Sequence, residues 1–148
     1  MKDHREMMIG ALKQVFIPDL RARGFKGSFP HFRRALAGRV DYLTVQFYSS
    51  GGSFVVEIAA AGPDGKPRGH GKRLPIDKLN VQYFSKRLRL GSKPESGNSD
   101  NWYVFGPRNY EPSTPLQATE HYLGIARQAM EDLERQGEPW FVANSGVA

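Results

Sequence analysis

Polar side chains alternate with apolar ones on two neighbouring segments, and they are the strongest candidates for binding chemistry in this chain. Thr44, Gln46 and Tyr48 occupy every second position of the first segment, and Glu57 lies on the second. Alternate residues of a β-strand point to the same side of a sheet, so we expect these four side chains on one face. Such a face either binds a partner or ligand through hydrogen bonds, or is the solvated or loop-covered side of an antiparallel sheet.

The glycine-rich segment 61–73, AGPDGKPRGHGKR, has the composition of a phosphate-binding loop but not its spacing. A phosphate loop requires Gly-Lys followed by Ser or Thr, and here Gly71-Lys72 is followed by Arg73. The dinucleotide-binding pattern fails as well, because Leu74 stands where its third glycine is required. We therefore expect no nucleotide cofactor and interpret the segment as a flexible basic connection.

Metal binding and nucleophilic catalysis have no recognisable motif either. The four histidines are spread over the chain without ligand spacing, and there is no cysteine. Ser53 lies in a predicted hairpin turn, whereas a serine nucleophile needs a strand-to-helix elbow. We predict no metal, no cofactor and no catalytic motif. One enzymatic alternative remains, a site assembled in space from Gln46, Glu57 and either His31 or His70.

Positive charge is concentrated in the first part of the chain. The net charge is +6, made up of +11 in residues 1–94 and −5 in residues 95–148. Basic side chains interleaved with aromatic ones are typical of surfaces that bind nucleic acid or another polyanion, whereas two parts of opposite charge can also simply screen each other. The candidate positions are the basic residues of 33–39, 66–73 and 86–93, with Arg33 and Arg34 among them.

A β-hairpin over residues 41–60 is the clearest element of the chain. Its strands, 41–48 and 53–60, alternate apolar and polar residues and are joined through Gly51-Gly52. A shared apolar face permits two registers, in which paired residue numbers sum to 103 or to 101. Glycine adopts the positive φ of tight turns without steric cost, which favours 103 and places Gln46 opposite Glu57.

Helices are expected near both ends of the chain. Residues 3–23 carry an apolar stripe at helical spacing, and Pro18 should kink or split this helix. Residues 114–136 carry a second stripe, with a capping box that starts at Thr114 and with Gly137 as the stop.

Three further segments complete the predicted sheet. Residues 29–35 form its first strand, 102–105 a short aromatic strand, and 74–81 a fourth strand or an irregular segment. We predict an α+β fold, in which an antiparallel sheet of about four or five strands surrounds the central hairpin. The N-terminal helix and the long C-terminal helix, 114–136, are expected to pack together on one face of that sheet.

Length and composition indicate a single globular domain, residues 1–148. Hydrophobic residues make up 39% and charged residues 24% of the chain, which is typical of folded rather than disordered proteins. The N-terminal MKDHREMMIG is charged and lacks the apolar core of a signal peptide or membrane span. With the absence of cysteine, this favours a cytoplasmic protein without membrane association.

Several short motifs recur in one order along residues 5–105. They are Gly24-Phe25, Phe32-Arg33-Arg34, Asp41-Tyr42-Leu43-Thr44-Val45-Gln46-Phe47, Gly51-Gly52-Ser53-Phe54-Val55-Val56-Glu57-Ile58 and Trp102-Tyr103. This ordered set resembles the bacterial domain-of-unknown-function family DUF4304. The resemblance implies a small bacterial α+β domain with no assigned activity, so it supplies no catalytic positions.

The hypothesis that these observations favour is a non-enzymatic interaction module of the bacterial cytoplasm that binds a protein partner. An immunity-type role, in which the module neutralises a toxin, is one form of it. It depends on the missing catalytic motifs and on the polar hairpin face. The candidate binding residues are Thr44, Gln46, Tyr48, Glu57, Arg33 and Arg34. Polyanion binding and an enzyme site assembled in space are the alternatives, and the oligomeric state stays open.

Overall fold

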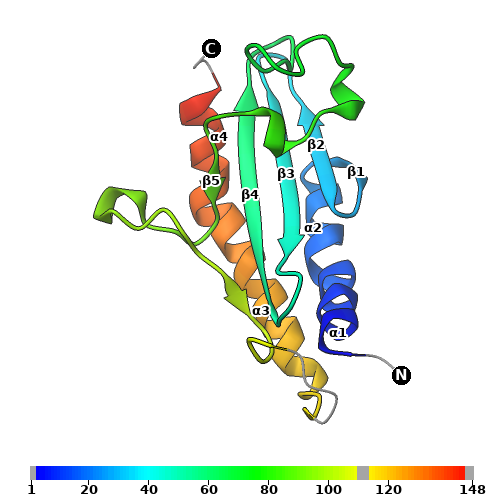
Figure 1. The fold of residues 1–148 in the computed structure, drawn as a ribbon. Coiled ribbons are helices and arrows are strands. Elements are labelled where there is room, and N and C mark those ends of the chain that lie inside the picture. Colours follow the sequence, from blue (N-terminus) through cyan, green and yellow to red (C-terminus); the bar gives the residue numbers. More distant parts are fainter. Residues whose placement is uncertain (1–2, 110–113, 146–148) are drawn as a thin grey trace.

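The computed structural model describes residues 3–109 and 114–145, which form an antiparallel sheet with two long helical segments behind it (Figure 1). The strand order is β1-β2-β3-β4-β5, and β6 pairs with β4 beyond the end of β5. The strands are β1 (Lys26–Ser28), β2 (His31–Ala35), β3 (Val40–Phe47), β4 (Ser53–Ala61), β5 (Leu88–Arg89) and β6 (Tyr103–Val104). The predicted α+β class is confirmed, with a helical segment from each end of the chain.

The N-terminal helical segment consists of α1 (His4–Ala11), a π-helical turn η1 (Leu12–Phe16) and α2 (Ile17–Ala22). Its first turn is capped by the Asp3 carboxylate, which accepts a hydrogen bond from the Glu6 backbone N–H at 2.8 Å. Pro18 has no N–H to donate to the preceding turn. The π turn η1 directly precedes Pro18 and accommodates this missing hydrogen bond. The predicted interruption is therefore present as a widened turn, and the helix continues on both sides of it.

The C-terminal helical segment is longer and starts later than the sequence predicts. It comprises α3 (Thr119–Asp132), a π turn η5 (Leu133–Gly137) and α4 (Glu138–Asn144). The predicted capping box at Thr114 is wrong, because the Gln117 N–H donates to the Tyr122 hydroxyl at 3.1 Å instead of to a capping side chain.

Gly137 does not stop the helix as predicted, because it serves packing. A Cβ at this position would lie 2.8 Å from Leu133 Cδ1 and 3.1 Å from Leu90 Cδ2. The glycine therefore lets the helix approach the sheet closely, and the chain continues as helix beyond it.

The central hairpin has the register that the sequence allowed but did not favour. Thr44 pairs with Glu57 and Gln46 with Val55, so paired numbers sum to 101, and the predicted Gln46–Glu57 pair is wrong. The Tyr48 N–H donates to the Ser53 carbonyl at 2.9 Å, which continues the same register into the turn.

The two hairpin glycines are required for close approach, not for positive φ. Neither Gly51 nor Gly52 has a positive φ. Gly52 donates to the Pro107 carbonyl and accepts from the Phe105 N–H, both at 2.8 Å. A Cβ on Gly51 would lie 1.7 Å from the Arg108 carbonyl oxygen. The segment after β6 therefore packs directly on the turn and selects its geometry.

The main core lies between the sheet and the helices. On β3 it takes the odd-numbered Leu43 and Val45, and on β4 the even-numbered Phe54, Val56 and Ile58. These residues are almost fully buried. The shared apolar face predicted for the hairpin is thus confirmed, since both permitted registers preserve it.

A smaller second core lies on the opposite side of the sheet, under the crossing loop, residues 62–87. This loop passes over the upper part of the sheet in Figure 1 and contains η2 (Ile76–Lys78) and η3 (Val81–Tyr83), so 74–81 is irregular and not a strand. The Tyr42 hydroxyl donates to the Gly65 carbonyl at 2.6 Å and anchors the loop. This second core joins Val40, Tyr42 and Ala59 of the strands to Leu79, Val81 and Phe84 of the loop.

Candidate functional site

The side of the sheet opposite the helices, called here the helix-free face, carries a continuous row of polar side chains. His31, Thr44, Glu57 and Arg89 lie directly opposite one another across β2, β3, β4 and β5. His31 Nδ1 and Thr44 Oγ1 are 2.9 Å apart, and Arg89 Nε lies 3.4 Å from Glu57 Oε2. The row therefore consists of one hydrogen-bonded pair next to one ion pair.

Aromatic and aliphatic side chains gather where the crossing loop leaves the helix-free face uncovered. The rings of Tyr48 and Trp102 meet edge to face with centroids 6.0 Å apart, and the Arg89 guanidinium lies 5.4 Å from the Trp102 centroid. Tyr48 is 39% and Val104 64% exposed. We call Gln46, Tyr48, Trp102 and Val104 the open end of the face.

The opposite end of the helix-free face, beside the crossing loop, is basic. Lys26 on β1 and Arg33 on β2 are cross-strand partners, so their side chains point to the same side. With Lys66 of the crossing loop they line a cleft of about 580 Å³, which also contacts Asp77. We call this the basic cleft.

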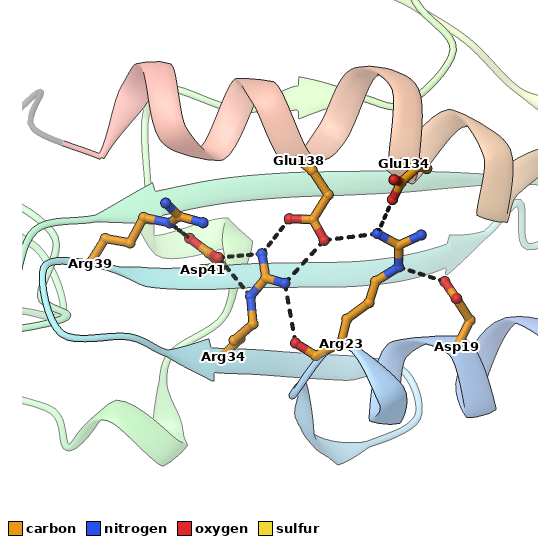
Figure 2. Close-up of polar contacts among 7 residues, drawn as sticks. All are labelled: Asp19, Arg23, Arg34, Arg39, Asp41, Glu134 and Glu138. Atoms are coloured by element: carbon orange, nitrogen blue, oxygen red, sulfur yellow. Dashed lines mark hydrogen bonds and ion pairs between the residues drawn. The ribbon is translucent and has the colours of Figure 1, made fainter.

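Arg34, a predicted binding residue, lies on the other side of the sheet in a buried ion-pair network (Figure 2). Its guanidinium contacts Asp41 at 2.7 Å and Glu138 at 2.6 Å. The Phe25 ring lies 4.5 Å from its central carbon, and Phe141 5.5 Å. Arg34 is therefore committed to the interior, a position that does not favour the predicted binding of a partner or polyanion.

The network joins the end of the N-terminal helical segment and the junction of η5 and α4 to the sheet, as Figure 2 shows. Arg23, just after α2, contacts Asp19 at 2.8 Å, Glu134 at 2.5 Å and Glu138 at 3.0 Å. Arg39 contacts the fully buried Asp41 at 2.9 Å. Because every charge in the network has a partner, we interpret it as a structural clamp rather than as a reactive site.

The titration of Glu138 follows from this network. Burial opposes its ionisation, but hydrogen bonds from Arg34 and Arg23 outweigh that effect and lower the pKa of the carboxyl below its usual 4.5. The same contacts raise the pKa of Arg34 against the opposing effect of burial. Both groups are therefore charged at neutral pH.

Acid should weaken the fold through Glu138. A carboxyl whose pKa is lowered in the folded state stabilises fully above its unfolded value, about 4.5, and loses that stabilisation as the pH falls through the folded pKa. We expect the midpoint of urea unfolding to fall between about pH 5 and pH 3. The variant Glu138→Gln should be less stable than the wild type at pH 7, and its urea midpoint should fall less over the same pH range. Parallel pH profiles of the two proteins would contradict this role.

The helix-free face brings together part of the proposed enzymatic constellation. His31, Gln46 and Glu57 share it, whereas His70 lies on the crossing loop and stacks on Tyr83 at 5.4 Å. Burial lowers the pKa of His31, which favours its neutral form. Glu57 forms ion pairs with two arginines, Arg87 at 3.6 Å and Arg89. Its carboxylate therefore contacts these arginines and not His31.

The predicted binding residues divide between the two sides of the sheet. Thr44, Gln46, Tyr48, Glu57 and Arg33 all share the helix-free face, and only Arg34 does not. Thr44 is buried within the row, while Gln46 and Tyr48 are exposed.

Ion pairs also reduce the predicted polyanion surface. Arg39 is held by Asp41, and Arg87 and Arg89 are held by Glu57. Sequence reasoning missed Lys26 and Trp102 as members of the helix-free face. Pairing with Arg33 places Lys26 on this face, and Trp102 lies there against Tyr48. Lys26 belongs to no motif, and the Trp102-Tyr103 motif does not say on which side of the sheet Trp102 lies.

Over residues 3–109 and 114–145 the structure places no group of three or more His, Asp or Glu residues that could hold a metal ion. In the same part of the chain, no helix is both long enough and apolar enough to cross a membrane. On the helix-free face the described side chains offer hydrogen bonds, charge and aromatic contact.

Comparison with known proteins identifies the family. The family model described as "Domain of unknown function (DUF4304)" matches residues 16–143. The chain belongs to the DUF4304 family. Searches of curated proteins and of solved structures both find no match. In this DUF4304 protein the family region includes the C-terminal helical segment, which the sequence motifs of residues 5–105 left out.

Proposed function

We propose that this DUF4304 protein is a non-enzymatic binding module of the bacterial cytoplasm whose helix-free face docks a protein partner with an acidic surface. The observation that carries the proposal is the open end, where Tyr48 and Val104 are exposed beside Trp102. Aromatic residues held rigidly on a sheet bury large areas at low entropic cost, and they are enriched among residues that dominate binding energy. An immunity-type module is one member of this class.

The open end favours a protein over a nucleic acid. Asp100 contacts Arg89 at 2.5 Å, and Glu57 contacts the same guanidinium. A phosphate backbone laid across Trp102 would meet these two carboxylates and an arginine that they already neutralise. A protein surface with an apolar centre has no such conflict, since the aromatic contacts need no net charge.

The basic end favours an acidic surface on that partner. Lys26, Arg33, Lys72 and Arg73 form no ion pair with any carboxylate of the described residues. Three of them are exposed, and Arg33 is half-buried. Unpaired cations at the far end of the face from the apolar patch attract and orient a negatively charged protein, and they accelerate its association at low salt.

The test begins with recovery of partners from cytoplasmic extract of the source bacterium, followed by calorimetry on the purified pair. We expect a saturable complex that the double variant Tyr48→Ala, Trp102→Ala weakens at least tenfold, since each aromatic side chain supplies about 1 kcal/mol or more of binding energy. Added salt should slow association, and nuclease treatment should leave the complex intact.

The matched control is Val142→Ala, an exposed aliphatic residue on α4 that is 62% exposed. It should bind like the wild type, and circular dichroism should show all variants folded. Equal affinity of the double variant and the wild type would contradict docking at the open end. A nuclease-sensitive complex whose affinity falls steeply with salt would instead show that a polyanion is the partner.

A further inference from the structure

The basic cleft lies between two walls, each held in place by contacts within the protein. One wall is the β1–β2 hairpin, which carries Lys26, Arg33 and Ala35, and the other is the crossing loop with Lys66, Ile76 and Asp77. The loop is held by the bond from Tyr42 to Gly65 and by the Lys66 ammonium, which donates to the Leu74 carbonyl. The cleft is therefore a preformed concavity rather than a gap between mobile segments.

Gly65 makes this arrangement possible. Its φ of +71° lies in the left-handed region that side chains rarely adopt. A Cβ there would lie 2.9 Å from Val40 Cγ2 and 2.8 Å from Ile76 Cδ1. The glycine thus lets the loop descend onto the sheet and bring Lys66 towards β2.

The charges in the cleft are unbalanced. Lys26 and Arg33 face each other directly across two strands, a placement that is unfavourable for like charges. Within the described residues neither forms an ion pair, although Asp77 lines the same cleft. The next residue along the strand, Arg34, shows the contrast, since its guanidinium contacts two carboxylates.

The apolar lining adds a second requirement. Ala35 and Ile76 lie in the cleft among the charged groups, and the volume of about 580 Å³ exceeds what a bare inorganic ion fills. A ligand that satisfies both features has an anionic head for the cations and a small hydrophobic body. Guanidinium and ammonium groups bind carboxylates and phosphates through charge-assisted hydrogen bonds.

We propose that the basic cleft is a binding site for a small organic anion, a carboxylate or phosphate carried on an apolar body. Arg33 and Lys26 bind the head group, Lys66 adds to the positive field, and Ile76 contacts the body. This goes beyond the docking proposal. It shares Lys26 and Arg33 with that proposal but does not depend on the aromatic residues of the open end, so variants of the open end separate the two.

The experiment is a titration of the full chain with phenyl phosphate, and separately with benzoate, followed by NMR and calorimetry. We expect saturable changes in the NMR chemical shifts of Lys26, Arg33 and Ile76. The probe that binds with the higher affinity identifies the preferred head group, phosphate or carboxylate. Arg33→Gln should weaken binding about tenfold, because it removes one charge-assisted contact. Asp77→Asn should strengthen binding several-fold, because it removes a like charge from the ligand's surroundings.

The matched control is Arg135→Gln, an arginine whose side chain is 76% exposed on the C-terminal helical segment. It should leave the affinity unchanged, as should the double variant Tyr48→Ala, Trp102→Ala of the open end. Non-saturable shifts spread over many basic residues would overturn the proposal. Equal affinities of Arg33→Gln and Arg135→Gln would overturn it as well, whatever the result with a protein partner.

Discussion

Replacement of Arg34 by methionine is expected to lower the free energy of unfolding by about 3–5 kcal/mol, as for removal of one partner from a buried ion pair. Asp41 is fully buried, and it would keep only Arg39. Glu138 would lose the contact at 2.6 Å that joins α4 to the sheet. Methionine preserves much of the apolar stem, so the loss reports on charge rather than on volume.

The matched control is Arg33→Met, in which the neighbouring arginine of the same strand is changed in the same way. Arg33 has no ion pair among the described residues, so we expect a change of only about 0.5 kcal/mol. Urea unfolding followed by circular dichroism measures both variants. Similar losses for the two substitutions would show that the network does not stabilise the fold.

The second large effect is expected at the hairpin turn, where Gly51→Ala should cost about 2–3 kcal/mol through overpacking. The new methyl group would lie 1.7 Å from the Arg108 carbonyl oxygen, and backbone atoms cannot move aside as a flexible side chain can. We expect the segment after β6 to separate from the turn. The amide protons of Gly52 and Phe105, which form the hydrogen bonds between the turn and this segment, should then exchange faster with solvent.

Gly10→Ala is the control for this substitution. Gly10 lies in α1 with nothing within 4 Å of its added Cβ, so alanine should stabilise the protein by about 0.5–1 kcal/mol. Opposite signs for the two Gly→Ala changes are the expected result. A neutral Gly51→Ala would contradict the role of close packing at this glycine.

The two strands of the central hairpin and their shared apolar face were predictable because they depend on local alternation. Val45 and Ile58 both lie on the buried side, as their positions in the pattern require. The choice between two registers was not predictable, since both keep that pattern intact. It depends on residues 105–108, which lie far along the chain and pack against Gly51 and Gly52.

The C-terminal helix likewise has one feature that the local sequence predicts and others that distant contacts determine. The apolar stripe of the C-terminal helix predicted its existence, but its start and stop depended on contacts made elsewhere. The Gln117 N–H donates to the Tyr122 hydroxyl, and Gly137 faces Leu90, which directly follows β5. Local capping rules assign both positions to helix ends, and tertiary packing overrides them.

For the candidate site, the sequence by itself determined which side chains alternate onto one face: Thr44, Gln46 and Tyr48 with Glu57. Strand geometry fixes that without knowledge of any distant contact. Only the tertiary structure decided that Arg34 is buried against Glu138 while Arg33, one residue earlier, faces the basic cleft. The physical reason is that a charge's environment is set by the carboxylates and loops that folding brings to it, and adjacent arginines on a strand meet opposite sides of the sheet.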